Sequence, residues 1–240
     1  SSSYCNDIVC TVRHYARYKH LPKSLQKYPM LRDHHSPEKA TLSSEEISLF
    51  LGLKPVKTSL LSPFSGKIIE RYINKRDFDR WTLFFKIMAF SGMRCGEVAH
   101  LRVEDVDFGR NVFCVRQEVS KTNESRLVPI APNIVGEVKE AVKNCTNGYL
   151  FPSKYGSVDL CGHPVVQNRD WHYNFHTRIK RLGIKRSRLT PYSLRHSFIT
   201  ALLAEDVALP KVMKIVGHRR IETTFRYTHL VTKDIQLAIR

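Results

Sequence analysis

Apolar side chains recur at the spacing of an α-helix along most of this 240-residue chain. The clearest run is spaced i, i+3, i+4 and i+7 and consists of Trp81, Phe84, Phe85 and Met88. Residues at this spacing share one face of a helix, and that face must be buried against a core. The same pattern predicts further helices over residues 134–142, about 164–182 and about 191–204. The chain is therefore expected to fold mainly into helices.

One segment departs from the helical spacing. Residues 112–115 and 127–130 are rich in Val, Phe, Leu and Ile, and a polar turn at residues 122–125 separates them. This pattern predicts a β-hairpin. The segment 54–77 is rich in Ser, Pro, Lys and Gly and has little periodicity, so we expect a loop or a short irregular insertion there. The predicted fold class is mostly α with a small antiparallel β-sheet.

A polar stretch near the N-terminus, residues 32–40, contains a proline and is expected to be a linker. Ser43 follows it, with Glu46 three residues later, which is the capping-box signature of a helix start. We therefore expect a boundary at residue 40. Residues 1–40 would hold the basic end of a helical segment plus the linker, and residues 41–240 would form the larger domain.

The charge of the chain is strongly positive. Lys and Arg number 39 against 22 Asp and Glu, which gives a formal net charge of +17. Such a surplus suits a polyanionic partner, either nucleic acid or an anionic membrane surface, with a role in solubility alone as the alternative. There is no apolar run of 18 residues, and the first residues lack the apolar stretch of a signal peptide, which disfavours a membrane-spanning or secreted protein.

The six cysteines form no CxxC pair and no repeating spacing. This usage favours reduced thiols in an intracellular protein over a disulfide framework. The best fragments of a metal site are Cys161-Gly-His163 and His34-His35, and neither has a second pair at ligand spacing. We therefore predict no metal site and a cytoplasmic protein.

Four short patterns contain candidate functional residues. The first two each include an arginine. A Gly-punctuated turn from Gly92 to Glu97 places Arg94 at the start of a helix, where free N–H groups and a guanidinium can bind phosphate. A surface Arg paired with Glu97 is the alternative. A second helix is expected to begin with Thr190 as its cap and Pro191 as its first residue.

In that second helix Tyr192 and Arg195 are spaced i, i+3, so they can present a hydroxyl and a cation to one phosphate; an ordinary amphipathic helix is the alternative. The third pattern is Gly217-His218, where Gly217 ends one helix and a further helix carries Tyr227 nine residues after His218. The fourth is Lys121 near the hairpin tip. Taken alone, Tyr227 could be a half-buried aromatic and Lys121 a solvated lysine.

Together these patterns resemble the tyrosine recombinases and integrases over roughly residues 41–240. The family's Gly-x-Arg-x-x-Glu turn falls on Gly92 to Glu97, its hairpin lysine on Lys121, and its His-x-x-Arg-His box on residues 192–196. Its Gly-His motif, with the nucleophile nine residues after the histidine, falls on Gly217, His218 and Tyr227. The resemblance implies a catalytic set of Arg94, Lys121, Tyr192, Arg195, His218 and Tyr227, with Glu97 in a supporting role.

One position departs from the family pattern, because Tyr192 stands where the box most often begins with His. A phenol can donate a hydrogen bond to a phosphate oxygen, but its pKa near ~10 makes it a poor proton shuttle at neutral pH. We assign Tyr192 to phosphate binding rather than to a general-base role. It could also compete as a nucleophile, and the family spacing favours Tyr227.

The resemblance implies a DNA strand transfer. Tyr227 would attack a phosphodiester, forming a 3′-phosphotyrosyl bond and freeing a 5′-hydroxyl; a second 5′-hydroxyl would then reverse the step. The number of phosphodiester-type bonds is conserved, so no ATP, metal or other cofactor is expected. Arg94 and Arg195 would clamp the phosphate oxygens, on which negative charge grows. Tyr192 and His218 would add hydrogen bonds, and Lys121 would protonate the leaving 5′-oxygen.

The remaining positive charge is expected to hold the DNA backbone. Six cations without an acid fall within eleven residues: Arg178, Lys180, Arg181, Lys185, Arg186 and Arg188. This stripe predicts salt-dependent binding, with a solvated loop as the alternative. Arg219 and Arg220 would contact phosphates beside the scissile one.

The resemblance also implies partners. Double-stranded DNA with a specific recombination site is expected, bound by a homotetramer that exchanges its apolar C-terminal tails; a tail folded on its own core is the alternative. Residues 1–40 would be the C-terminal remnant of a core-binding helical domain plus linker. The leading function is a site-specific recombinase or integrase. A type IB topoisomerase or telomere resolvase remains an alternative, as does an inactive DNA-binding regulator that uses residues 191–216.

Overall fold

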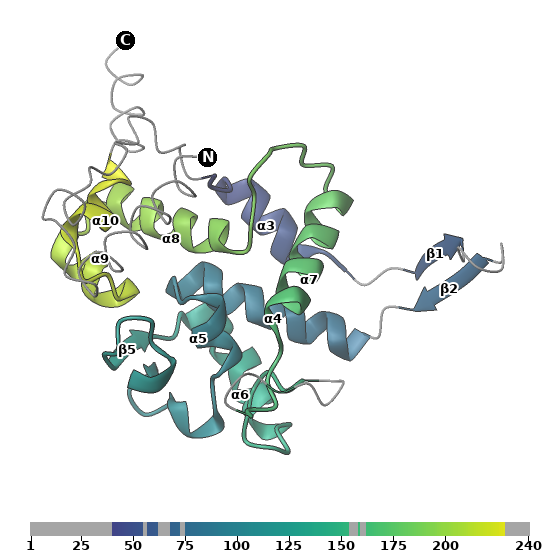
Figure 1. Ribbon diagram of the computed structural model, residues 1–240, viewed down its shortest axis with the longest axis horizontal. Coiled ribbons are helices and arrows are strands. Elements are labelled where there is room, and N and C mark those ends of the chain that lie inside the picture. The colour runs from purple at the N-terminus through teal and green to yellow at the C-terminus, as the bar shows by residue number, and fades with distance from the viewer. Residues whose placement is uncertain are drawn as a thin grey trace, which may run out of the picture. The chain divides into compact units, whose positions relative to one another are not determined.

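The computed structural model describes residues 40–54, 57–61, 68–72, 75–153, 158 and 162–228, and the backbone alone in 57–61 and 68–72. The predicted N-terminal segment with its linker and the apolar tail lie outside the described residues. The described part is mainly helical and carries a small antiparallel sheet (Figure 1), which confirms the predicted fold class. No helix in this part combines the length and hydropathy needed to cross a bilayer.

The helices of the described part are α3 (Ser44–Gly52), α4 (Lys75–Ser91), α5 (Cys95–Ala99), α6 (Val135–Lys143), α7 (Asn168–Arg181), α8 (Tyr192–Ala204), α9 (Leu209–Val216) and α10 (Ile221–Phe225). Single 3₁₀ turns cover Val103–Asp105, Gln117–Val119 and Pro132–Ile134. The strands are β1 (Lys57–Leu61), β2 (Ile68–Tyr72), β3 (Val106–Asp107), β4 (Val112–Val115) and β5 (Arg126–Pro129).

Helix α4 organises the main core because its apolar side chains pack on several neighbours. It contacts α3, α5, α6 and α8 (Figure 1). The Phe85 ring lies 5.3 Å from the Phe50 ring of α3, and Phe50 lies 5.2 Å from Phe175 of α7. Burying one such aromatic side chain contributes about 1.5–3 kcal/mol. The capping box at the start of α3 is confirmed, since Ser43 and Glu46 exchange backbone-to-side-chain hydrogen bonds.

The predicted hairpin over residues 112–130 is confirmed. Strands β3, β4 and β5 form an antiparallel sheet in that order, and Phe113 is paired with Val128. Both of these side chains are buried, as is Val115, whereas Leu127 is exposed. The alternation sets one face of the sheet on the core. The connection between β4 and β5 carries Lys121.

The prediction of a loop over residues 54–77 is wrong. Strands β1 and β2 pair antiparallel within it, from Lys57 opposite Tyr72 to Leu61 opposite Ile68. Each strand satisfies the backbone hydrogen bonds of the other. The Ser, Pro and Gly residues that gave the segment its loop-like composition gather at residues 62–66, between the two strands.

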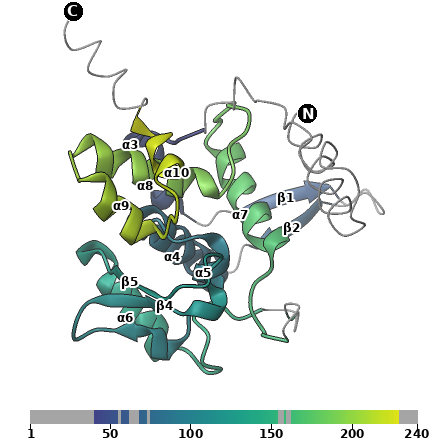
Figure 2. The same cartoon turned by 60° about the vertical axis from the view of Figure 1, so that its left-hand side comes forward.

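A second, smaller core lies between α8, α9 and α10. Its buried members are Ile199, Val212, Val216 and Tyr227. Figure 2 shows the C-terminal end of α9 close to α5 and β5. Two predicted helix bounds are corrected here: α8 begins at Tyr192, after Pro191, and α10 ends at Phe225, so Tyr227 lies in the turn that follows. No side chain caps α8; instead, the Thr190 N–H donates to the Ser193 hydroxyl.

Candidate active site

Arg94 lies at the start of α5, and Glu97 fixes it there. The Arg94 backbone N–H donates to Glu97 Oε2 at 2.8 Å, and Nη1 donates to Oε1 at 2.8 Å. Gly92 allows the turn into α5, because its φ is +65° and a Cβ would come within 2.5 Å of the Phe198 ring. The predicted ion pair with Glu97 exists, yet Nη2 of Arg94 also donates to the Gly217 carbonyl at 2.9 Å.

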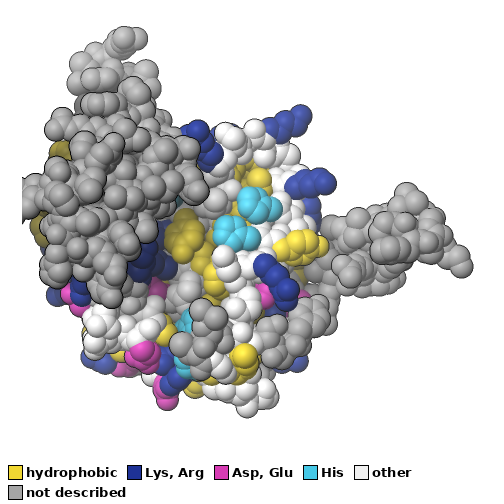
Figure 3. All heavy atoms as spheres, viewed as in Figure 1, with side chains coloured by type: hydrophobic (Ala, Val, Ile, Leu, Met, Phe, Trp, Pro, Cys, Tyr) yellow, Lys and Arg dark blue, Asp and Glu magenta, His cyan; other side chains and the backbone are white. Residues whose placement is uncertain are grey.

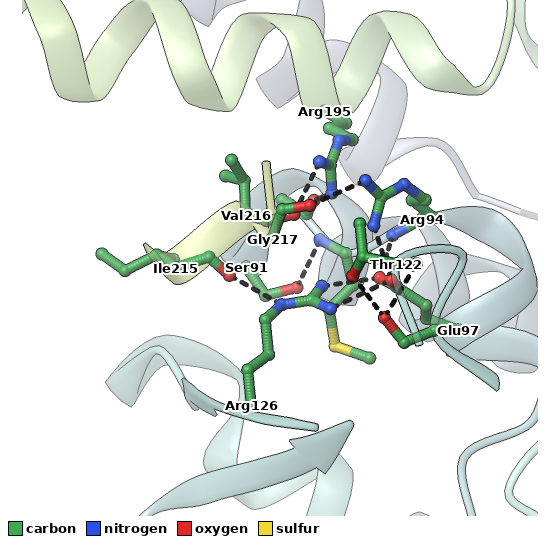
Figure 4. Close-up of polar contacts among 12 residues, drawn as sticks. Ser91, Arg94, Glu97, Thr122, Arg126, Arg195, Ile215, Val216 and Gly217 are labelled. Atoms are coloured by element: carbon green, nitrogen blue, oxygen red, sulfur yellow. Dashed lines mark hydrogen bonds and ion pairs between the residues drawn. The ribbon is translucent and has the colours of Figure 1, made fainter. Parts of the chain in front are cut away.

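Arg195 reaches the same turn from α8. Its side chain is only 3 % exposed. Nη1 donates to the Gly92 carbonyl, and Nη2 donates to the Val216 carbonyl at 2.6 Å (Figure 4). Burial, with the Arg94 charge second, lowers the pKa of the guanidinium to about 9, so Arg195 remains charged at pH 7. Arg195 therefore ties the turn before α5 to the end of α9.

A third arginine, Arg126 of β5, completes the group, although none of the four sequence motifs includes it. Nη1 and Nη2 donate to the two oxygens of Glu97 at 3.0 and 2.7 Å, and Nε donates to the Ile215 carbonyl at 2.9 Å (Figure 4). Burial alone would raise the pKa of Glu97, but hydrogen bonds and charge from Arg126 and Arg94 bring it below its usual value. A lone Arg at a strand start carries no sequence signal for such a role.

Three arginines thus hold three successive carbonyls at the C-terminal end of α9, those of Ile215, Val216 and Gly217. These are the carbonyls that a helix leaves unpaired, and its dipole makes this end attractive to cations. Gly217 has φ +70°, and a Cβ on it would lie 3.0 Å from Arg126 Nη1, so both its conformation and its contacts require glycine. With Glu97 as the counter-ion, the group keeps a net charge of about +2.

His218 and the hairpin loop lie beside this turn. His218 Nδ1 is 2.8 Å from the Oγ1 of Thr224, a buried residue of α10. Arg219 binds Glu124 of the β4–β5 connection, with Nε at 3.1 Å from Oε1. This contact ties the turn after Gly217 to the loop that carries Lys121, whose side chain is exposed.

Tyr227 is 1 % exposed and lies in the second core. Its hydroxyl is 2.6 Å from Nδ1 of His196, the residue after Arg195 on α8. Burial raises the pKa of Tyr227 to about 12, although Arg195 and Arg226 act in the opposite direction. No role was predicted for His196 from the sequence, although it is the last residue of the 192–196 box.

Tyr192 occupies a different environment from Tyr227. It lies in the first turn of α8 and is 38 % exposed. Burial of its ring raises the pKa of the phenol; the charges of Arg94 and Arg195 oppose that shift. Its hydroxyl therefore stays protonated at neutral pH and can donate a hydrogen bond.

The predicted DNA-binding stripe is wrong at one position, Arg178. Its side chain is 3 % exposed, Nη2 donates to the Phe78 carbonyl at 3.0 Å and to Thr82 Oγ1 at 2.9 Å, and the guanidinium lies 4.0 Å from the Phe78 ring centre. Arg178 is part of the core because α7 turns it inward against α4. A charge count along the sequence cannot distinguish inward from outward positions on a helix.

The other members of the stripe lie at or near the surface. Lys180, Lys185, Arg186 and Arg188 are exposed, and Arg181 is half-buried, donating to the Lys54 carbonyl at 2.7 Å. Arg186 binds Glu46 of α3. Arg219 and Arg220 are exposed. Basic side chains line the upper edge of the face seen in Figure 3, where Figure 1 places the connection between α7 and α8.

Replacing Arg178 by alanine is expected to lower the free energy of unfolding by about 2 kcal/mol, because it removes charge-assisted hydrogen bonds and a contact with an aromatic face. It should leave the salt dependence of DNA binding unchanged. Lys180→Ala on the same helix is the matched control, with stability within about 0.5 kcal/mol of wild type and a lower salt slope. Denaturant titration measures the free energy of unfolding, and binding at several salt concentrations measures the salt slope. An unchanged stability in Arg178→Ala would contradict the core assignment.

No group of three or more His, Cys, Asp or Glu side chains is arranged to hold a metal ion among the described residues. The side chains that meet at the candidate site carry guanidinium, imidazole, hydroxyl and carboxylate groups. Guanidinium groups aimed at one place bind tetrahedral oxyanions such as phosphate well.

Comparison with known proteins identifies the family. Residues 67–233 match the Phage integrase family. Tyrosine recombinase XerD of Lacticaseibacillus casei is 30 % identical over 183 residues, which are 73 % of this chain and 61 % of that protein. Tyrosine recombinase XerA of Pyrococcus horikoshii is 29 % identical over 189 residues, 78 % of this chain and 61 % of that protein. The chain spans about three-fifths of the length of these relatives.

Solved structures share the fold. XerH recombinase bound to a palindromic difH substrate superposes with a TM-score of 0.66 at 20 % identity, over 90 % of this chain and 57 % of that one. The catalytic domain of bacteriophage HP1 integrase gives 0.53 at 20 % identity, over 84 % of this chain and 94 % of that one. With the family match over residues 67–233 and the ordered motifs from Gly92 to Tyr227, these likenesses show that the chain belongs to the phage integrase family of tyrosine recombinases.

Proposed function

We propose that this chain is the catalytic part of a site-specific DNA recombinase that cleaves and rejoins strands through Tyr227. The observation that carries the proposal is the convergence of Arg94 and Arg195, from two different helices, on the turn that precedes His218. Within the described residues, Glu97 and Gly217 take two of the five N–H donors of Arg94, which leaves three for phosphate oxygens. The local charge of about +2 suits a phosphodiester that becomes more negative during the attack.

We propose the following reaction for these groups. The Tyr227 oxygen forms a bond to phosphorus, and the bond from phosphorus to the 5′-oxygen breaks. Arg94 and Arg195 stabilise the non-bridging oxygens, while Tyr192 and His218 add hydrogen bonds. Lys121 gives a proton to the 5′-oxygen, which leaves as a hydroxyl. Attack by another 5′-hydroxyl on the phosphotyrosyl bond runs the same steps backwards and joins new partners.

The partners belong to the same proposal. The net charge of +17 and the exposed cations around residues 180–188 support double-stranded DNA as the substrate. The likeness to XerH, a site-specific recombinase bound to its difH substrate, favours recombination at a specific site. We further propose a homotetramer on two DNA sites with exchange of the C-terminal tails, and a domain division at residue 40 in which residues 1–40 end a core-binding domain.

Covalent trapping tests the proposal. The chain is incubated with EDTA and a pool of random-sequence duplexes that each carry one nick, so that a cleaved strand is lost and the phosphotyrosyl adduct accumulates. We expect an SDS-resistant adduct with the wild type and with Tyr192→Phe, and none with Tyr227→Phe. Sequencing the trapped DNA would name the target site.

Two outcomes would count against this assignment. An adduct in Tyr227→Phe but not in Tyr192→Phe would move the nucleophile to Tyr192. A wild-type chain that binds the pool and forms no adduct would favour a DNA-binding regulator. Relaxation of supercoiled plasmid without sequence preference would identify a topoisomerase instead.

A further inference from the structure

The hydroxyl of Tyr227 touches an imidazole to which the four motifs give no task. Tyr227 Oη lies 2.6 Å from Nδ1 of His196, a short hydrogen-bond distance between a phenol and an imidazole. The two rings are 5.6 Å apart and tilted by 41°. His196 follows Arg195 directly on α8, so the element that holds the phosphate clamp also holds this imidazole.

The proposed reaction needs a base at this place. The attacking oxygen must lose its proton, and burial raises the pKa of Tyr227 to about 12. At pH 7 only about one phenol in 10⁵ would then be ionised. With 1 % of its surface exposed, Tyr227 has little access to bulk water as a proton acceptor. A group in direct contact with the oxygen has to take the proton as the bond to phosphorus forms.

Tyr192 is a poor candidate for that base, whereas His196 is a good one. The pKa of the Tyr192 phenol is itself raised, so it does not ionise near neutral pH. An imidazole has an ordinary pKa near ~6.5 and can accept a proton in that range. His196 lies four residues after Tyr192 on α8, which puts both on one side of the helix. His196 closes the 192–196 box, so the imidazole that contacts Tyr227 lies one helical turn from Tyr192.

We propose that His196 is a catalytic residue that accepts the proton of Tyr227 during cleavage and returns it during rejoining. The inference rests on the proposed function. In the neutral tautomer with the proton on Nε2, the lone pair of Nδ1 faces the phenol. Cleavage moves the proton from Tyr227 Oη to His196 Nδ1, forms the bond from oxygen to phosphorus, and breaks the bond to the 5′-oxygen. Lys121 supplies the separate proton that the leaving 5′-oxygen takes up, so every proton in the step has a donor and an acceptor.

Two substitutions separate proton acceptance from positioning. His196→Asn places an amide oxygen near the position of Nδ1, so it keeps a hydrogen-bond acceptor but is not basic. His196→Ala removes both properties. We expect both variants to cleave a nicked duplex about 10²–10³-fold more slowly in a single turnover, with DNA affinity near wild type. The melting temperature should stay near wild type in His196→Asn and fall in His196→Ala, where the buried Tyr227 hydroxyl loses this hydrogen bond. His176→Asn, an exposed histidine on α7, is the matched control and should cleave at the wild-type rate.

A change of leaving group distinguishes the role of His196 as the base from that of Lys121 as the acid. A substrate with sulfur in place of the bridging 5′-oxygen releases a thiolate, which leaves without a proton. It should restore cleavage to Lys121→Ala and leave His196→Asn slow. Three results would each overturn the inference. They are cleavage by His196→Asn at the wild-type rate, cleavage by His196→Ala at a rate above that of the wild type, and rescue of His196→Asn by the sulfur substrate. Absence of any adduct in the wild type would instead overturn the proposed function.

Discussion

Replacing Glu97 by alanine is expected to unfold the candidate site and to abolish adduct formation. The carboxylate is the counter-ion of both Arg94 and Arg126, with contacts of 2.7–3.0 Å, and is almost fully buried. Its removal would leave two guanidinium groups without their counter-ion, a loss that costs about 3–5 kcal/mol when a buried ion pair is broken from one side. Denaturant titration measures the free energy of unfolding, and covalent trapping measures the activity.

The matched control for Glu97 is Glu104, a carboxylate in an exposed ion pair with Arg102. Exposed pairs contribute about 0–1 kcal/mol, so Glu104→Ala should be nearly silent. Equal losses of stability in the two variants would contradict the role of Glu97 as the buried counter-ion. Glu97→Gln, which keeps the shape and one acceptor, should lie between the two.

The stabilisation by Glu97 also has a defined pH dependence. Its folded-state pKa is lowered below the ordinary value of 4.5. A lowered carboxylate pKa stabilises the fold at pH values above the unfolded pKa, and that stabilisation is lost as the pH falls through the folded one. The stability gap between wild type and Glu97→Gln should therefore be constant above about pH 5.5 and shrink as the pH falls below 4.5. A gap that grows on acidification would contradict the lowered pKa.

The sequence allowed the helices and the main hairpin to be predicted because their signals are local. The spacing of Trp81, Phe84 and Phe85 depends only on residues within α4. The capping box likewise depends only on residues at the start of α3. The pairing of β1 with β2 was missed because a Ser-, Pro- and Gly-rich connection dominates the composition of residues 54–77. Local composition reflects the residues between the two strands, whereas strand pairing depends on which strand lies opposite.

The site was predictable where motifs fix residue types and hidden where contacts are long-range. Arg94 and Arg195 stand in ordered motifs, but Arg126 acquires its role only when β5 meets α5 and α9 across 29 and 89 residues of sequence. Arg178 shows the reverse error, since a charge run suggested a surface and the fold buries one of its members. In both cases the helix or strand face that a side chain occupies decides its role, and only the packing reveals that face.

Replacing Arg195 by lysine separates the geometry of the guanidinium from its charge. A lysine keeps the positive charge, but its compact ammonium cannot span the Gly92 and Val216 carbonyls as the planar fork does. We expect single-turnover cleavage to fall by at least about 10²-fold, the usual effect of removing a preorganised donor at a developing oxyanion. The affinity for DNA should change little, because one cation among many contacts the backbone.

The paired variant Lys185→Gln/Arg188→Gln should behave in the opposite way. Both side chains are exposed on the connection between α7 and α8. Each phosphate contact that is lost lowers the slope of log affinity against log salt by about 0.9, so the double variant should lower it by about 1.8 and leave cleavage at saturating DNA unchanged. Two results would contradict this distinction between a catalytic cation and DNA-binding cations. One is a loss of affinity alone in Arg195→Lys, and the other is a slower cleavage step in the double variant. The difference follows from position, since Arg195 is buried and fixed beside Arg94 on the turn at Val216 and Gly217, whereas Lys185 and Arg188 are exposed and can contact any nearby phosphate of the DNA backbone.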